Sequence, residues 1–340
     1  MRYILRLVSW LVLLAAPGLI VADTVPPVDF SFFWRLAPSV FKIEAYSRNG
    51  GVSVGSGVLV RPGLVVTNCH VTRQAVSIQI VKQGSRWDAH AQVSDVEHDV
   101  CLLEAPEITG TVASMNGSRP HVGQRVIAVG YVGGLAPQLS GGEVQALYRY
   151  DGGQVIQSTA WFNSGASGGG LFDQDGELIG IIAFRHQGGD YHFALPVDWI
   201  YSNLDLEQAR AVTPLGQGVA FWQRNGDGQP YFLKAAALEA KHDWPALREL
   251  AEKWSAVETG NCDAWLSLGL ANARLGDLDR AVSAFVEAIH SDLENSEAWF
   301  SLGLAYAALG ERQRVDEVQR VLLTLNEDLA AKLNRDARIR

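Results

Sequence analysis

The stretch that decides the fold is Asn163-Ser164-Gly165-Ala166-Ser167-Gly168-Gly169-Gly170-Leu171, which puts a serine in a glycine-rich loop before an apolar strand. Two segments nearer the N-terminus belong with it. Val65-Val66-Thr67-Asn68-Cys69-His70-Val71 runs a strand into a histidine, and Glu97-His98-Asp99-Val100-Cys101-Leu102-Leu103 opens an apolar strand with an aspartate. His70, Asp99 and Ser167 therefore follow one another along the chain, each at a strand boundary.

These three residue types in this order suit nucleophilic cleavage of a peptide bond. Ser167 attacks a carbonyl only if a base removes its proton, and His70 is the candidate base. A sheltered carboxylate holds such a histidine in the right tautomer, and Asp99 fits that role. The oxyanion of the intermediate needs backbone N–H donors, which Gly165 and Ser167 would supply because glycine adopts backbone angles closed to other residues.

Each segment alone also fits a structural explanation, namely a tight turn, a packed histidine or a capping aspartate. The order of all three within a strand-rich region favours the catalytic interpretation. His98 lacks a position at a strand end. His186 and His192 follow the serine, an order that suits α/β-hydrolases, whose alternation of helices and strands is missing here.

Length and composition indicate two folded domains in an acidic protein. The chain has 340 residues, 48% of them hydrophobic and 19% charged, with 34 glycines. The formal net charge of -9 argues against nucleic-acid binding, which needs clustered basic surface.

The chain divides into four predicted regions. Residues 1–22 are expected to be a signal peptide and residues 24–205 an all-β domain, because many short segments alternate at period two between glycine-rich turns. Residues 206–229, with weak periodicity, are expected to be a linker. Residues 230–335 are expected to be helical.

The predicted signal peptide makes this an exported protein, periplasmic or secreted. Arg2 and Arg6 precede an apolar run, Pro17-Gly18 breaks it, and Ala22 suits cleavage. The alternative is a retained membrane anchor, but Leu7 to Ala22 falls short of the roughly 20 residues that a spanning helix needs. No stable membrane anchor is expected after cleavage.

The helical region repeats itself. Residues 264–276 recur 34 residues later as 298–310, with ten of thirteen positions identical. This period, with Trp, then Leu-Gly, then a closing Gly, resembles the tetratricopeptide repeat, and the resemblance implies a concave groove that docks a protein partner or substrate. Residues 231–256 are a candidate for a divergent earlier repeat. The alternative is an unrelated set of helical hairpins.

The β domain, from Gly55 to about Asp198, resembles the trypsin-like serine proteases, and most of all the bacterial HtrA/Deg branch. The landmarks that match in order are Gly55-Ser56-Gly57, Val66-Thr67-Asn68-Cys69-His70-Val71, His98-Asp99-Val100, Ser164-Gly165-Ala166-Ser167-Gly168-Gly169 and Phe193-Ala194-Leu195-Pro196. The resemblance implies an all-β fold of two six-stranded barrels, followed here by an all-α repeat domain. It also implies protein or peptide substrates. Ala166 stands where the branch usually has Asn, and helical repeats stand where it has its peptide-binding domain.

The resemblance also indicates a specificity pocket. Trp161, six residues before the serine, and Phe162 would lie at its base, with His192 and Phe193 along another wall. No aspartate stands there, so we do not expect a preference for Lys or Arg. Bulky walls predict a shallow apolar pocket for small aliphatic side chains.

Three cysteines are too few for a disulfide framework and fit no zinc pattern. Cys69 and Cys101 lie beside the histidine and the aspartate, so they form either a bracing disulfide or a pair of buried thiols. Cys262 is expected to be unpaired and buried. No metal or organic cofactor is implied.

The leading hypothesis is an exported serine endopeptidase. The alternatives are an interaction protein with a silent protease fold, in which Ala166 and the Trp161-Phe162 pair obstruct the cleft, and an esterase that uses the same three residues.

Overall fold

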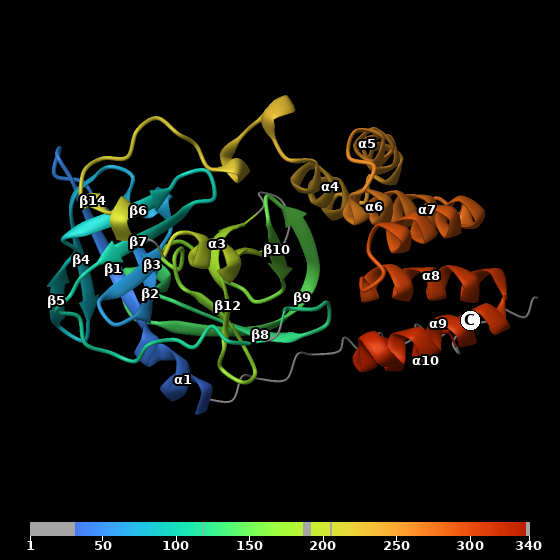
Figure 1. Ribbon diagram of the computed structural model, residues 1–340, viewed down its shortest axis with the longest axis horizontal. Helices are drawn as coiled ribbons and strands as arrows, with labels where there is room; N and C mark the ends of the chain where they lie inside the picture. The colour runs from blue at the N-terminus through green and yellow to red at the C-terminus, as the bar shows by residue number, and fades with distance from the viewer. Residues whose placement is uncertain (1–30, 118, 186–191, 205, 338–340) are drawn as a thin grey trace, which may run out of the picture.

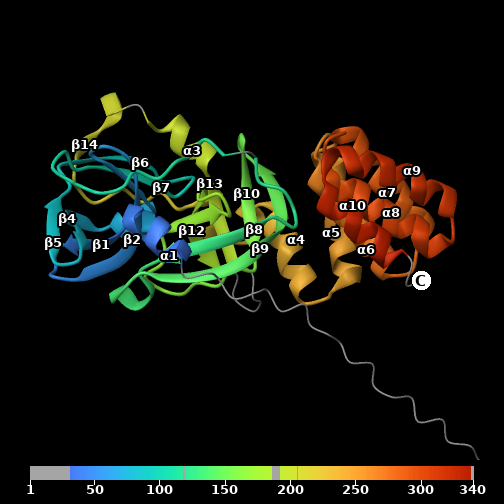
Figure 2. The same ribbon diagram turned by 90° about the horizontal axis from the view of Figure 1, so that it is seen from below.

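A computed structural model describes residues 31–117, 119–185, 192–204 and 206–337. The predicted signal peptide and His186 lie outside these ranges. Figure 1 shows two β units on the left and a stack of helices on the right, and Figure 2 shows the same division after a quarter turn. None of the helices within the described ranges combines the length and the apolar character needed to cross a bilayer.

The first β unit is an eight-stranded antiparallel sheet with the strand order β14-β6-β7-β3-β2-β1-β4-β5. A short helix α1 (Ser31–Leu36) and a single turn η1 (Ala37–Ser39) lead into it. Its strands are β1 (Val40–Ser47), β2 (Val52–Arg61), β3 (Leu64–Thr67), β4 (Ala75–Lys82), β5 (Ser85–Asp88), β6 (Ala91–Asp95), β7 (Val100–Glu104) and β14 (Arg210–Ala211), and the short helix α2 (Cys69–Thr72) follows β3.

The second β unit is a closed six-stranded barrel with the order β10-β13-β12-β11-β8-β9. A turn η2 (Val132–Gly134) and a helix α3 (Val197–Ser202) accompany it. Its strands are β8 (Arg125–Gly130), β9 (Gln138–Tyr150), β10 (Gly153–Ser158), β11 (Gly170–Asp173), β12 (Leu178–Arg185) and β13 (His192–Pro196).

The β architecture matches the expected all-β domain, with one difference in the first unit. The resemblance implied two six-stranded barrels, whereas the ladder of the first unit has eight strands and is not closed within the described residues. The extra strands are β5, which forms a tight hairpin with β4, and β14, which adds two residues to the edge of β6. Both extend an edge of the sheet, so the central strands keep their pairing.

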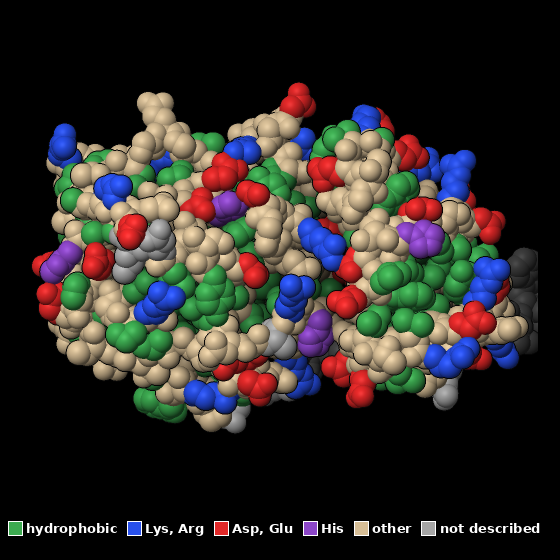
Figure 3. Space-filling model, in the orientation of Figure 1, with side chains coloured by type: hydrophobic (Ala, Val, Ile, Leu, Met, Phe, Trp, Pro, Cys, Tyr) green, Lys and Arg blue, Asp and Glu red, His purple; other side chains and the backbone are tan. Residues whose placement is uncertain are grey.

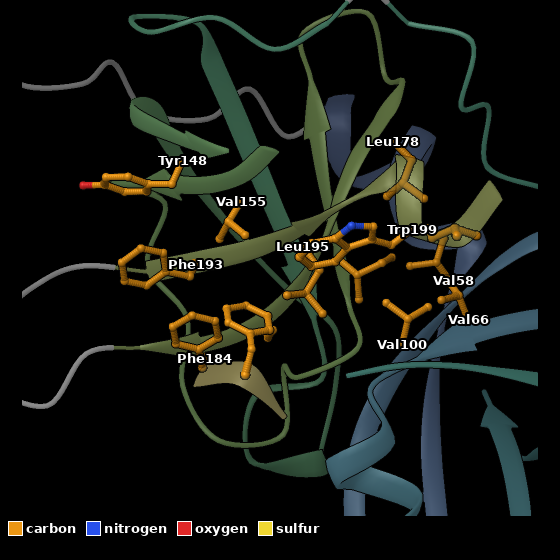
Figure 4. Close-up of a cluster of buried hydrophobic side chains, with 14 of the residues drawn as sticks. Val58, Val66, Val100, Tyr148, Val155, Leu178, Phe184, Phe193, Leu195 and Trp199 are labelled. Carbon is orange, nitrogen blue, oxygen red and sulfur yellow. The ribbon is translucent and has the colours of Figure 1, made fainter. Parts of the chain in front are cut away.

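One hydrophobic cluster joins the two β units. Figure 4 shows Val58, Val66 and Val100 of the first sheet beside Leu178 and Trp199 of the second unit. These side chains are all buried, so the two units share an apolar interface. Burial of this much apolar surface fixes their mutual orientation, and with it the loops that lie across the interface.

The C-terminal region is all helical, as predicted, and its helices pair as antiparallel hairpins consistent with repeats. Its helices are α4 (Tyr231–Ala240), α5 (Trp244–Val257), α6 (Cys262–Arg274), α7 (Leu278–Ser291), α8 (Ser296–Leu309), α9 (Arg312–Leu325) and α10 (Glu327–Asp336). A Cβ added to Gly269 would lie 2.3 Å from the ring of Phe285, so glycine lets α6 and α7 approach closely. Cys262 is buried and unpaired.

The segment predicted to be a linker packs against the β units. It contains the turns η3 (Leu206–Gln208), η4 (Phe221–Gln223) and η5 (Gly226–Gly228) besides β14. Phe221 is fully buried in the shared hydrophobic cluster, and its N–H donates to the carbonyl of Glu97. Figure 1 shows this segment in yellow, passing over the first β unit toward α4. It is therefore part of the folded β region.

The surface carries mixed charge. On the face drawn in Figure 3, Lys and Arg side chains are interspersed with Asp and Glu over both the β units and the helices.

Candidate active site

Asp99 and His70 are hydrogen-bonded at the interface of the two β units. His70 lies on α2, directly after β3, and Asp99 lies in the turn before β7. The Nδ1 atom of His70 is 2.7 Å from Oδ2 of Asp99, and the His70 backbone N–H donates to Oδ1 over 2.8 Å. Asp99 is 1% exposed. Because the carboxylate accepts at Nδ1, that nitrogen carries the proton and Nε2 is left as the basic atom.

The backbone around Asp99 is held from several sides. Its φ of 62° lies in the left-handed region, which Asp tolerates better than most residues. Its carbonyl accepts from the Asn68 side chain over 3.0 Å and from the Cys69 N–H over 3.3 Å. A disulfide joins Cys69 to Cys101, with the Cα atoms 4.9 Å apart. The structure therefore contains the disulfide that the sequence left open, and not two free thiols. The bond ties α2, which carries His70, to β7, which begins directly after Asp99.

Ser167 lies in the glycine-rich loop before β11, close to α2. A Cβ added to Gly55 would lie 2.6 Å from Val71, the neighbour of His70, and 3.1 Å from the carbonyl oxygen of Ser167. The Ser167 hydroxyl donates to the carbonyl of Ala183 over 3.2 Å. Within the described part of the chain, no hydrogen bond joins it to His70. Such bonds are often absent before substrate binds.

The loop that contains Gly165 is fixed by its carbonyl groups. The carbonyl of Ser164 accepts from the Gly133 N–H over 2.8 Å, and the carbonyl of Gly165 accepts from the Ser56 hydroxyl over 2.7 Å. Gly165 has a φ of 93°, and an added Cβ would lie 2.4 Å from the Tyr131 carbonyl oxygen, so only glycine fits. No group among the described residues accepts from the N–H of Gly165 or of Ser167, so both donors are available to a ligand.

Ser56 is a site residue whose role the sequence did not reveal. Its buried hydroxyl donates to the Gly165 carbonyl and accepts from the Tyr131 N–H over 2.8 Å. Its own N–H donates to the carbonyl of Ser167 over 2.7 Å. One residue of β2 thus ties the serine loop to the first sheet. Its place in the Gly55-Ser56-Gly57 landmark is the only signal that pointed to it.

The residues expected in the specificity pocket divide into two groups. Trp161 is 48% exposed, and the buried ring of Phe162 contacts the His192 ring with centroids 4.7 Å apart. Phe193 is fully buried in the core and stacks on Phe184 at 4.8 Å. The prediction that Phe193 lines the pocket is therefore wrong, because its side chain lies in the core. Neighbouring residues of a strand point to opposite faces, so His192 and Phe193 do not line one wall.

The cavity beside Phe162 is small. It is also lined by Trp161, Ala166 and Gly130, and its volume of about 30 Å³ admits little more than one water molecule. The larger cavities lie elsewhere. One of about 870 Å³ separates β8 and β9 from helices α8 and α10.

His98, the alternative base, is held in a separate ion-pair cluster. Its Nδ1 lies 2.7 Å from Oδ2 of Asp95, and its Nε2 lies 3.0 Å from Oδ2 of Asp151. Burial alone lowers the pKa of His98, but the two carboxylates outweigh that effect and the pKa is raised. With both ring nitrogens engaged, His98 has no free atom to act as a base.

Comparison with known proteins shows which domain the β region resembles. The family model of the trypsin-like peptidase domain matches residues 55–181. The chain carries a trypsin-like peptidase domain. The domain has the chymotrypsin-like fold, and its curated relatives include HtrA/Deg proteins that are named serine proteases.

Two relatives illustrate the similarity. The periplasmic pH-dependent serine endoprotease DegQ of Escherichia coli is 38% identical over 178 residues, which is 48% of this chain and 38% of DegQ. The serine protease HTRA1B of Danio rerio is 31% identical over 185 residues, covering 49% of this chain and 38% of the relative. This chain thus spans well under half the length of these curated relatives.

A solved structure illustrates the shared fold. The Rv3671c protease of M. tuberculosis in its active form superposes with a TM-score of 0.50 and 22% identity, covering 55% of this chain and 88% of that chain.

Proposed function

We propose that this protein is an exported serine endopeptidase with Ser167 as nucleophile, His70 as general base and then acid, and Asp99 as the orienting carboxylate. The observation that carries the proposal is the hydrogen bond of 2.7 Å between His70 and the buried Asp99, next to a serine loop with two unused N–H donors. The relatives named serine endoproteases support the same chemistry.

The reaction follows from this arrangement. The Ser167 hydroxyl leaves the Ala183 carbonyl, gives its proton to Nε2 of His70 and attacks the substrate carbonyl carbon. The N–H groups of Gly165 and Ser167 hold the oxyanion, each donor lowering the barrier by about 3 kcal/mol. His70 then protonates the leaving amine as the C–N bond breaks, and water releases the acyl group from Ser167.

The proposed location is the periplasm or the exterior of the cell. The N-terminal sequence pattern of residues 1–22 supports it, and so does the name of the relative DegQ, a periplasmic endoprotease. The disulfide between Cys69 and Cys101 is of the kind that persists in oxidising compartments.

The proposed preference is for a small aliphatic side chain at the bond to be cut. The buried contact between Phe162 and His192 and the small cavity beside them support it, because they leave no room for a long side chain. A peptide library that is cleaved mainly after Lys or Arg would contradict this preference.

The helices are proposed to bind a protein partner or the substrate. Part of the surface between them and the barrel is already occupied. The backbone N–H of Arg149 on β9 donates to Oδ2 of Asp263 on α6 over 2.7 Å, and the Arg149 side chain pairs with Asp292. Two cavities, of about 790 Å³ and about 870 Å³, lie along this boundary and leave room for a partner.

The proposal is tested by labelling the mature protein with a fluorophosphonate probe. We expect labelling that Ser167→Ala and His70→Ala both abolish. A folded protein that is not labelled would favour the silent interaction protein. Labelling with turnover of esters but not of peptides would favour the esterase.

A further inference from the structure

The side chain of Trp222 reaches the candidate catalytic pair from a segment that follows the matched peptidase residues. Its Nε1–H donates to Oδ2 of Asp99 over 3.1 Å, and its ring meets the His70 ring edge-on with centroids 5.5 Å apart. Trp222 belongs to η4, in the segment between the barrel and the helices, well beyond the matched residues 55–181.

The hydrogen bond of Trp222 completes the set of donors around a buried charge. Oδ1 of Asp99 accepts from the His70 backbone N–H, and Oδ2 accepts from both His70 Nδ1 and Trp222 Nε1. Because Asp99 is almost wholly shielded from water, a missing donor is not replaced easily by solvent. The indole therefore fixes the rotation of the carboxylate, and the carboxylate fixes the imidazole.

Trp222 is itself held rigidly. Its ring stacks on Phe184 of β12 with centroids 4.9 Å apart and an interplanar angle of 10°. The preceding residue, Phe221, is buried in the core, and Gln223 on the other side is hydrogen-bonded to Arg73. The Arg224 side chain then pairs with Glu97, two residues before Asp99.

We propose that Trp222 is a positioning residue for the His70–Asp99 pair, so that the interdomain segment completes the catalytic site. This inference rests on the proposed function. It also gives the helices a physical connection to the catalytic site, because Phe221 of the same turn contacts Phe232 of α4 with ring centroids 6.1 Å apart. A displacement of α4 would be passed through Phe221 to its neighbour Trp222.

The test compares Trp222→Phe with Trp199→Phe in the full chain. Phe at position 222 keeps an aromatic ring on Phe184 and removes the N–H. Trp199 is the matched control, since it is a buried indole in the same aromatic cluster whose N–H donates to the carbonyl of Asp151 over 3.0 Å and not to Asp99. Replacing Trp222 by 3-benzothienylalanine, which exchanges the N–H for sulfur, separates the hydrogen bond from ring packing.

We expect both Trp222 variants to lower kcat about 10-fold to 100-fold with little change in KM, since bonds to buried charges are worth roughly that factor. The low-field proton resonance of His70 Nδ1–H should also shift. Trp199→Phe should lower the melting temperature but leave kcat and that resonance unchanged.

The inference is overturned if the benzothienyl variant keeps the kcat and the His70 resonance of the unmodified protein. It is also overturned if the losses in Trp222→Phe and Trp199→Phe are equal, because Trp222 then acts only through stability. If the unmodified protein shows no activity that depends on Ser167, the proposed function fails and this inference falls with it. Retained activity in the variants contradicts the inference alone.

Discussion

Replacing Ser56 by alanine tests whether the first β sheet holds the serine loop in its working conformation. The substitution removes one hydroxyl from a fully buried position and leaves the Gly165 carbonyl and the Tyr131 N–H without their partner. Each unsatisfied buried group costs about 1–3 kcal/mol. With two such groups, we therefore expect the free energy of unfolding to fall by about 2–6 kcal/mol.

The effect on catalysis follows from the same contacts. Without the Ser56 hydroxyl, the peptide group after Gly165 keeps only the bond from the Ala166 N–H to the Asn163 carbonyl, so the backbone that orients the neighbouring Gly165 N–H is held less tightly. One such donor is worth about 3 kcal/mol of barrier, so kcat should fall about 100-fold with KM nearly unchanged.

The assay is the rate of fluorophosphonate labelling together with hydrolysis of a short peptide, at a temperature where the variant is folded. Ser53→Ala is the matched control, because Ser53 lies on the same strand with its side chain exposed to solvent. Labelling of folded Ser56→Ala at the unmodified rate would refute the role given to Ser56.

Three further predictions concern stability. Cys69→Ser together with Cys101→Ser should lower the free energy of unfolding, measured by denaturant titration, by about 2–4 kcal/mol. A reductant should destabilise the unmodified protein by the same amount and should not change the stability of the double variant. Gly269→Ala should destabilise the helices by about 1–3 kcal/mol because the added Cβ would overlap the ring of Phe285. Gly260→Ala is the control and should change stability little, because the space around Gly260 is open. Equal melting temperatures for the two variants would contradict the packing argument. Burial raises the pKa of Asp263 from 3.8 to about 7, so the folded state holds a proton that the unfolded state loses, and its contribution to stability is fully present below about pH 4 and lost as the pH rises through about 7. Asp263→Asn should remove this pH dependence from melting curves recorded at pH 5 and pH 8. An unchanged dependence would rule out Asp263 as its source.

Much of this architecture could be predicted from the sequence because it depends on short-range patterns. Period-two alternation marked the strands, and the 34-residue period marked the paired helices. The order of His70, Asp99 and Ser167 singled out candidates, and two of them are joined by a short hydrogen bond. Cys262 was expected to be buried and unpaired, and it is.

The remaining features depend on long-range contacts that no local pattern encodes. Trp222 lies 123 positions from Asp99, in a segment whose weak periodicity predicted only a linker. Phe193 was assigned to the pocket from its distance along the chain, but the alternation of β13 turns it into the core. The two added strands of the first sheet depend on which edges were left open. In each case, the position of a residue along the chain does not show which residues it meets in space.

The most direct test of the central claim is cleavage of an unfolded protein by the purified mature chain, with the products identified by mass spectrometry. The account predicts new termini after small aliphatic residues, and none when Ser167→Ala replaces the unmodified protein. Cleavage that persists in Ser167→Ala would contradict the account. A protein that is labelled at Ser167 but cuts no peptide bond would contradict it as well.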